Sequence, residues 1–178
     1  MADEAHTDGF PVLRHMLLEF PDDLSARHAE TQYMLGDSIL VAPVMSADGQ
    51  VDVYVPEGTW TSLLDGSKVT GPRWVRQRHA MDSLPVLVRP GTVLPLGRDT
   101  QRPDYPWARG VTLKVFELSD AVPQAVLIPG FGADPASRFS VRRAGGRLEA
   151  EGPKDFSWRL AHGDRVIAAV DGSAVLEL

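Results

Sequence analysis

The fold is decided by the stretch VDVYVPEGTWTSLLDG, residues 51–66, and by three neighbouring stretches. These are PVLRHMLLEFPDD (11–23), QYMLGDSILVAPV (32–44) and DSLPVLVRPGTVLPLG (82–97). Alternation in the first stretch puts Val51, Val53 and Val55 on one face of an expected strand. Short β-branched runs broken by Gly, Pro and Asp turns are typical of an antiparallel sandwich. We therefore predict a mainly β fold.

The N-terminal part has a different texture. The apolar run PVLRHMLLEF (11–20) lies between two prolines, which favours a buried strand, although a short helix fits the periodicity as well. The following segment LSARHAETQYML (24–35) is the best helical candidate, and Gly36 is placed as its C-cap. We expect the apolar run to pack against the first β-domain, because exposing it would be costly.

A polar, turn-rich stretch divides the remaining sequence. GRDTQRPDYPWARG (97–110) is the best candidate for a domain boundary. Beyond it, short strand-like runs alternate with Gly, Pro and Asp turns, and Gly145-Gly146 is a strong hairpin signal. This pattern predicts a second small β-domain.

Composition excludes several classes of partner. The 178 residues carry a net charge of −6 without a basic stripe, so nucleic acids and anionic membrane surfaces are poor partners. Cysteine is absent, which excludes disulfides and thiolate metal sites and fits a reducing compartment. No stretch approaches the ~18 consecutive apolar residues of a membrane span, and the N-terminal MADEAHTDGF does not read as a secretory signal. A cytoplasmic location is the expectation.

The four quoted stretches, in this order, resemble α-glycosidases of glycoside hydrolase family 31, particularly the α-xylosidase-like branch. The resemblance implies that residues 1–36 are a remnant of a (β/α)8 barrel, comprising its last strand (VLRHMLLEF) and a short helix. It further implies a proximal C-terminal β-sandwich over residues 37–98 and a distal β-domain over residues 99–178. The fold class expected is two small antiparallel β-sandwich domains preceded by that remnant.

The resemblance also says which chemistry is missing. The family hydrolyses glycosides with retention, using an aspartate nucleophile and a second carboxylic acid. These lie in motifs like K-T-D-F-G-E and D-I-G-G-F, neither of which occurs here, and GFGAD (130–134) falls in the distal region. No catalytic residue and no cofactor are assigned. The chain is expected to be a non-catalytic accessory region, inactive by itself.

Partners follow from the same reasoning. The missing catalytic barrel, in cis in the parent enzyme, is the first, and an α-linked oligosaccharide is a second. Surfaces that once met a barrel would also favour a homo-oligomer. The alternative function is a free-standing carbohydrate-binding β-sandwich protein. A third reading, a small hydrolase, would need a pair of carboxyl groups about 5 Å apart that no spacing suggests.

Four residues are candidates for substrate binding. Glu19, Asp22 and Asp23 follow what would be a barrel strand, where barrel enzymes place their chemistry, but acids after a proline are also ordinary helix-start residues. Trp107, in the polar boundary, could stack on a sugar ring or fill a contact between domains. Trp60 is expected to be structural.

Two arginines and five histidines complete the candidates. Arg14 and Arg89 each lie in an apolar run and need a carboxylate partner, for which Glu19 and Asp82 are available. The histidines show neither H-x-x-x-H nor H-E-x-x-H spacing, so no metal site is predicted.

Overall fold

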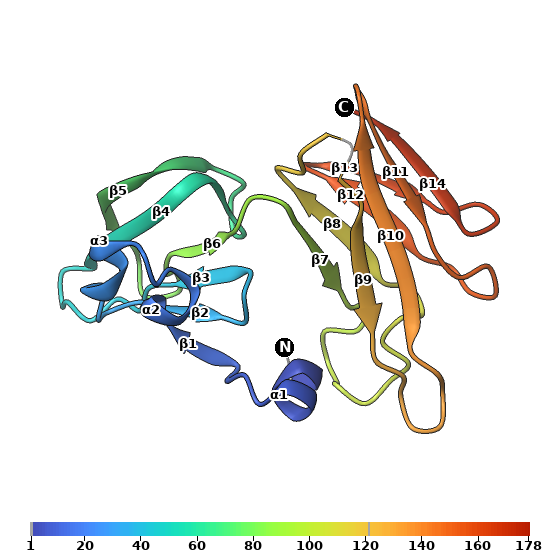
Figure 1. Ribbon diagram of the computed structural model, residues 1–178, viewed down its shortest axis with the longest axis horizontal. Helices are drawn as coiled ribbons and strands as arrows, with labels where there is room; N and C mark the ends of the chain where they lie inside the picture. The colour runs from blue at the N-terminus through green and yellow to red at the C-terminus, as the bar shows by residue number, and fades with distance from the viewer. Residues whose placement is uncertain (1, 121) are drawn as a thin grey trace. The chain divides into compact units, whose positions relative to one another are not determined.

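The computed structural model describes residues 2–120 and 122–178 and divides them into two compact units. The first unit ends at Pro90 and the second begins at Gly91 (Figure 1). Both units are built mainly from antiparallel strands, which confirms the mainly β class. None of the helices formed by the described residues is long and apolar enough to span a bilayer.

A six-stranded sheet and three short helices make up the first unit. The helices are α1 (Ala2–Asp8), α2 (Met16–Glu19) and α3 (Leu24–Arg27). The strands are β1 (Leu13–His15), β2 (Tyr33–Leu35), β3 (Ile39–Val41), β4 (Gln50–Ser62), β5 (Lys68–Arg78) and β6 (Val86–Val88). Their order in the sheet is β1-β2-β3-β6-β4-β5, and every pairing is antiparallel.

The long hairpin of β4 and β5 follows the predicted alternation. Val51, Val53 and Val55 are all buried. The register shifts after Val55, where Pro56 has no N–H to donate to the ladder. A Cβ on Gly71, opposite this bulge, would lie 2.0 Å from the carbonyl oxygen of Pro56, so only glycine fits there.

A buried glutamine completes the inner edge of β4. Between Val55 and Gln50, β4 pairs with β5 on one side only. Gln32 supplies the missing partner: its Nε2 donates to the Tyr54 carbonyl at 2.8 Å, and the Tyr54 N–H donates to its Oε1 at 2.7 Å. The side-chain amide thus replaces one step of a strand. Nearby, Trp60 is fully buried and donates to the Pro56 carbonyl, which confirms its structural role.

Two predictions for the N-terminal segment are wrong in detail. The helix expected over 24–35 lasts one turn, α3, and the chain then forms β2, because pairing with β1 and β3 overrides the local helix preference. Gly36, with φ of 62°, lies in the turn between β2 and β3 and is not a C-cap. Only the three residues of β1 are extended within the run 11–20, and α2 follows directly.

The second unit contains two four-stranded sheets. Their strands are β7 (Thr92–Leu96), β8 (Thr112–Phe116), β9 (Gln124–Ile128), β10 (Ser137–Ala144), β11 (Arg147–Glu151), β12 (Arg159–His162), β13 (Arg165–Ala168) and β14 (Ser173–Glu177). One sheet has the order β14-β11-β10-β9 and the other β13-β12-β8-β7. The β10–β11 hairpin turns at Gly145-Gly146, as predicted. The one parallel pairing of named strands joins β8 and β12.

The core of the second unit is centred on Trp158. Its side chain is 1% exposed, meets the ring of Phe139 edge-on at 5.4 Å between centroids, and donates to the Pro153 carbonyl. Leu113, Leu148 and Leu160 belong to the same buried cluster. Because β7 lies in the second unit, the two units divide between Pro90 and Gly91, before the domain boundary at 98–99 expected from the sequence. The assignment of residues 1–36 to a barrel remnant stays a prediction.

Candidate functional site

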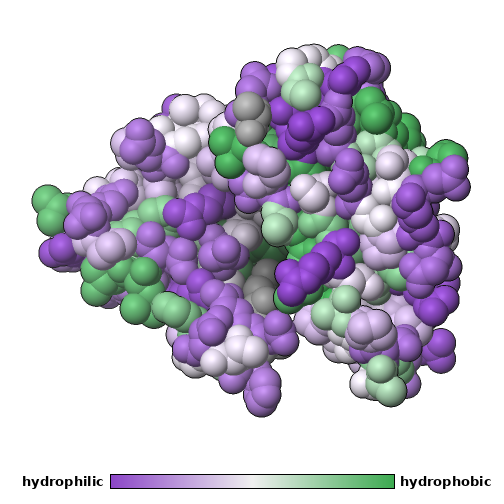
Figure 2. Space-filling view, turned by 45° about the vertical axis from the view of Figure 1, so that its right-hand side comes forward, coloured by the Kyte–Doolittle hydropathy of each residue, from purple (hydrophilic) through white to green (hydrophobic). Residues whose placement is uncertain are grey.

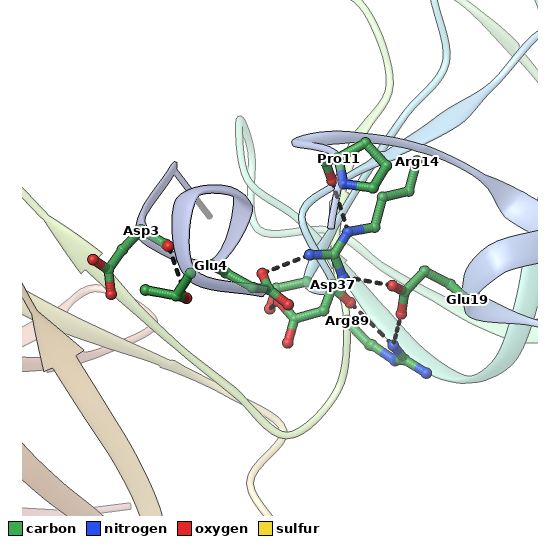
Figure 3. A network of polar contacts seen from close by, with 9 residues as sticks. Asp3, Glu4, Pro11, Arg14, Glu19, Asp37 and Arg89 are labelled. Atoms are coloured by element: carbon green, nitrogen blue, oxygen red, sulfur yellow. Dashed lines mark hydrogen bonds and ion pairs between the residues drawn. The ribbon is translucent and has the colours of Figure 1, made fainter. Parts of the chain in front are cut away.

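Glu19 lies at the centre of an ion-pair network in the first unit. Arg14 Nη1 donates to Glu19 Oε1 at 2.7 Å, and Arg89 Nη1 donates to Glu19 Oε2 at 3.1 Å (Figure 3). Arg14 also donates to the Pro11 carbonyl through Nε and to Glu4 through Nη2. Because both carboxylate oxygens of Glu19 accept from a guanidinium, this residue is held in place rather than free for substrate.

Burial separates the two arginines. The Arg14 side chain is only 3% exposed, whereas that of Arg89 is 35% exposed. Burial alone would lower the pKa of Arg14, but the hydrogen bonds to Glu19 and Glu4 outweigh it, and the pKa of Arg14 is raised above its usual value. Of the two carboxylates expected as candidate partners, Glu19 pairs with both arginines. Asp82, the other partner considered, is exposed.

Asp22 and Asp23 lie in the turn before α3 and differ in surroundings. Asp22 is exposed, whereas Asp23 is the N-cap and accepts from the backbone N–H groups of Ser25 and Ala26. The Tyr54 hydroxyl donates to Asp23 Oδ2 at 2.6 Å. Burial and this hydrogen bond raise the pKa of Tyr54 to about 12. Asp23 therefore caps a helix and fastens it to β4.

These contacts favour structural roles over a carboxylate pair for catalysis. A retaining glycosidase needs one carboxylate free to attack and one acid free to give up a proton. Glu19 is engaged by two arginines, and Asp23 is engaged by a helix N-terminus and Tyr54. The structure thus gives these two residues different partners and does not present them as a shared site.

A serine–histidine contact lies elsewhere in the first unit. His79 Nδ1 is 2.8 Å from Ser83 Oγ, and its Nε2 is 3.0 Å from Gln77 Oε1. In a catalytic triad the third member is a carboxylate that stabilises the imidazolium formed during the reaction. A neutral amide cannot supply that charge, so the contact gives little support to a small hydrolase.

The N-terminal segment of the first unit exposes an unusual amount of apolar surface. Its residues include five large apolar side chains between 42% and 70% exposed: Phe10, Leu13, Leu17, Leu18 and Leu24. We call these five residues the apolar strip. β1, which carries Leu13, is a terminal strand of the sheet, and among the described strands it pairs with β2 alone. The expectation that the run 11–20 packs away holds for Met16 and Phe20, but not for Leu13, Leu17 and Leu18.

The strip is defined by its concentration within one short segment, since other exposed apolar residues of the chain are more scattered along the sequence. On the face shown in Figure 2, hydrophilic residues predominate and apolar residues gather in separate patches. Scattered exposed apolar residues are normal on any protein, whereas a concentration within one short segment indicates a contact surface. The same segment carries a terminal strand, and such an edge is a site where another strand can pair.

Trp107 lies in the second unit beside a residue that sequence reasoning missed. Its ring is 39% exposed and meets the ring of Phe131 edge-on, with centroids 5.9 Å apart. Both line a pocket of about 340 Å³. Phe131 belongs to the segment 130–134, whose likeness to a catalytic motif of the family is limited to the sequence. The turn-rich composition around an aromatic residue was the signal for an exposed ring.

No metal site emerges from the described residues. Across 2–120 and 122–178, no group of three or more His, Asp or Glu side chains is arranged to hold an ion.

Comparison with known proteins places the chain. Residues 9–94 match the model of the glycosyl hydrolase family 31 C-terminal domain, and residues 106–177 match the model of the C-terminal domain of the α-xylosidase YicI. The chain belongs to the C-terminal region of glycosyl hydrolase family 31. The family resemblance read from the sequence is thereby confirmed, including its α-xylosidase-like branch.

Individual relatives agree with the family 31 assignment. The chain is 44% identical over 107 residues to an α-xylosidase of Emericella nidulans, covering 56% of this chain and 14% of the relative. It is 35% identical over 143 residues to the α-xylosidase XylQ of Lactiplantibacillus pentosus, covering 79% of this chain and 19% of the relative. This family 31 chain therefore spans less than a fifth of either relative.

Solved structures share the fold. A family 31 α-xylosidase of Xanthomonas citri superposes with a TM-score of 0.77 over 99% of this chain and 22% of its own, at 20% identity. A family 31 dextranase of Flavobacterium johnsoniae superposes with a TM-score of 0.74 over 89% of this chain and 22% of its own, at 24% identity. At these identities the likeness concerns the fold alone.

Proposed function

We propose that this chain is the non-catalytic accessory region of a retaining α-xylosidase or α-glucosidase, and that it supports a catalytic barrel in cis. The family 31 models cover its two β-regions, and the described acids that sequence reasoning singled out are engaged in structural contacts. In this proposal, hydrolysis belongs to the barrel. The first unit would contribute a rigid surface against which the barrel packs.

The apolar strip is the observation that carries the proposal. Five large apolar side chains within residues 10–24 face solvent beside an open strand edge. At about 25 cal/mol per Å² of buried apolar surface, covering such a surface stabilises a contact by several kcal/mol. A barrel to which this segment supplies the last strand would cover both the side chains and the edge.

The Glu19 network gives the strip a fixed position. Arg14 belongs to β1, Glu19 to α2, and Arg89 follows β6, so the network ties the segment to the middle of the sheet (Figure 3). A contact surface that is already ordered loses less conformational entropy on binding. The network therefore favours a docking role for this segment over a disordered tail.

The docking role is tested by binding to a catalytic region. The partner would be the part of XylQ that precedes the segment matched by this chain, made as a separate protein. We expect the wild-type chain to bind it, and the double variant Leu13→Asp/Leu18→Asp to bind at least tenfold more weakly, since two charges would be buried at the contact.

A matched control separates docking from general surface effects. Leu64 is 59% exposed in the β4–β5 hairpin of the same unit, and Leu64→Asp should leave the affinity unchanged. Equal affinity for the strip variant and the wild type would contradict the docking role. Loss of self-association in the strip variant, without any binding to the catalytic region, would instead identify a homo-oligomer contact.

The alternative is a free-standing carbohydrate-binding protein. The exposed rings of Trp107 and Phe131 favour it specifically. It predicts saturable oligosaccharide binding without turnover and no affinity for a catalytic region. A cytoplasmic location forms part of both proposals, since a chain without cysteine suits a reducing compartment.

A further inference from the structure

Three loops of the second unit meet around one pocket. They are the β7–β8 loop with Trp107 and Arg109, the β9–β10 loop with Phe131 and Asp134, and the β11–β12 loop with Asp155. Arg138, on β10, completes the set that we call the aromatic pocket. Its volume of about 340 Å³ lies within the range of roughly 300–1,000 Å³ that small-molecule sites occupy.

Two rings form a corner in this pocket. Trp107 and Phe131 are 39% and 37% exposed, and their planes meet at 70°. The indole Nε1 donates to the Pro103 carbonyl at 2.7 Å, which fixes the orientation of the ring and uses its only polar group. What Trp107 offers a ligand is therefore an apolar face. The C–H face of a pyranose ring is flat and apolar, and it matches such a surface.

The walls of the pocket are formed in advance. Prolines 106, 129, 135 and 153 restrict the backbone on all three loops. The β9–β10 loop closes on itself through a hydrogen bond from the Asp134 N–H to the Phe131 carbonyl. A Cβ on Gly130 would lie 1.7 Å from the Asp134 carbonyl oxygen, so this close approach requires glycine. A pocket already in shape loses little entropy when a ligand enters.

The charges around the pocket cancel. Two arginines, Arg109 and Arg138, stand against two aspartates, Asp134 and Asp155. Arg109 lies over the Phe156 ring at 5.7 Å, and within the part of the chain that the structure describes none of the four forms an ion pair. Guanidinium groups donate and carboxylates accept hydrogen bonds, so the pocket offers both to a ligand. A neutral ligand rich in hydroxyl groups fits this arrangement better than an ion of either sign.

We infer that the aromatic pocket is a non-catalytic binding site for a neutral oligosaccharide, with a pyranose ring stacked on Trp107. The choice of α-linked glucose oligosaccharides rests on the proposed function, whereas the site itself does not. It would hold a carbohydrate chain on the second unit.

Titration calorimetry of the 178-residue chain with isomaltotriose and maltotriose tests this site. We expect saturable binding of at least one of the two. Trp107→Ala and Phe131→Ala should each weaken it about tenfold or more, as expected for the loss of an aromatic anchor. Trp74→Ala is the matched control: Trp74 is a 49% exposed tryptophan on β5 of the first unit, and its loss should leave the affinity unchanged.

Two results would overturn the inference. One is the absence of saturation by either sugar at concentrations that fill a millimolar site. The other is an equal loss of sugar affinity in Trp74→Ala and Trp107→Ala. NMR spectra of the β10 and β11 amides report whether each pocket variant is folded, spectra of the β4 amides do so for Trp74→Ala, and having two pocket variants guards against one misfolding. Because the apolar strip lies in the other unit, failure of sugar binding would leave the docking result intact.

Discussion

Replacing Glu19 by glutamine should destabilise the first unit far more than a comparable change at a surface ion pair. The substitution keeps the shape of the side chain but removes the negative charge that faces Arg14 and Arg89. Arg14, 3% exposed, would retain the Pro11 carbonyl and Glu4, whose side chain is 35% exposed. The nearly buried guanidinium would thus lose its best-shielded counter-charge.

The magnitude follows from the burial of the partners. Removing one member of a buried ion pair costs about 3–5 kcal/mol, because the remaining charge stays desolvated. The contacts that Arg14 keeps, and the hydrogen bond that glutamine can still accept, reduce this cost. Arg89 is 35% exposed, and water replaces much of its lost interaction. We therefore expect a loss of about 2–3 kcal/mol in the free energy of unfolding of the first unit.

Glu149 provides a matched control within the same chain. It also pairs with two arginines, but Arg142 and Arg147 are 57% and 52% exposed. Glu149→Gln likewise removes a negative charge that pairs with two arginines. We expect only a minor change in the free energy of unfolding of the second unit, because solvent screens these partners. Hydrogen exchange read by mass spectrometry gives the stability of each unit separately, in peptides from β4 and from β10.

The reasoning is refuted if Glu19→Gln weakens protection in β4 no more than Glu149→Gln weakens it in β10. That result would mean that the Arg14–Glu19 contact is too loosely held to compensate for the burial of Arg14. A second check is Arg14→Met, which removes the buried charge. When combined with Glu19→Gln, a well-packed methionine at position 14 should restore part of the stability that Glu19→Gln alone loses.

Three further outcomes follow from the same structure. The pKa of Tyr54 is raised from 10.0 to about 12 in the folded state. The neutral Tyr54 side chain therefore contributes fully to stability below pH 10, and this contribution is lost as the pH rises towards 12. Urea unfolding measured at several pH values should show this dependence for the wild type but not for Tyr54→Phe. Hydrogen bonds from Ser62 and Ser67 lower the pKa of Asp65 to about 2, so an NMR titration should place the Asp65 midpoint there and Ser62→Ala should raise it. Gln32→Ala should cost about 2–4 kcal/mol, measured by denaturant unfolding, because the N–H and carbonyl of Tyr54 lose their partner.

The strand pattern could be predicted where local signals and tertiary packing agree. Val51, Val53 and Val55 alternate in the sequence and are buried in β4, and Gly145-Gly146 turns the β10–β11 hairpin. The helix predicted over residues 24–35 was wrong because strand pairing with distant segments competes with the local helical periodicity. Gln32 fits β4 through a contact 22 residues away, and no local pattern reports such a distance.

The candidate site shows the same division. Charge chemistry predicted that Arg14 and Arg89 would need a carboxylate, because an arginine in an apolar run requires one, but only the structure selects Glu19 over Asp82. The roles of Asp23 and Phe131 depend on three-dimensional neighbours, Tyr54 and Trp107, that lie far along the sequence. The exposure of Leu17 and Leu18 was not foreseen either, since an apolar run reads as buried whether its cover lies in the same chain or in a partner.

The central claim is that this chain supports a catalytic barrel and does not catalyse hydrolysis itself. The most direct measurement is the hydrolysis of an aryl α-xyloside and an aryl α-glucoside by the repurified chain, by the separate XylQ catalytic region, and by the two mixed. We expect no turnover from the chain alone, and higher activity of the catalytic region with the wild-type chain than with Leu13→Asp/Leu18→Asp. Turnover by the chain alone that survives repurification would contradict the account.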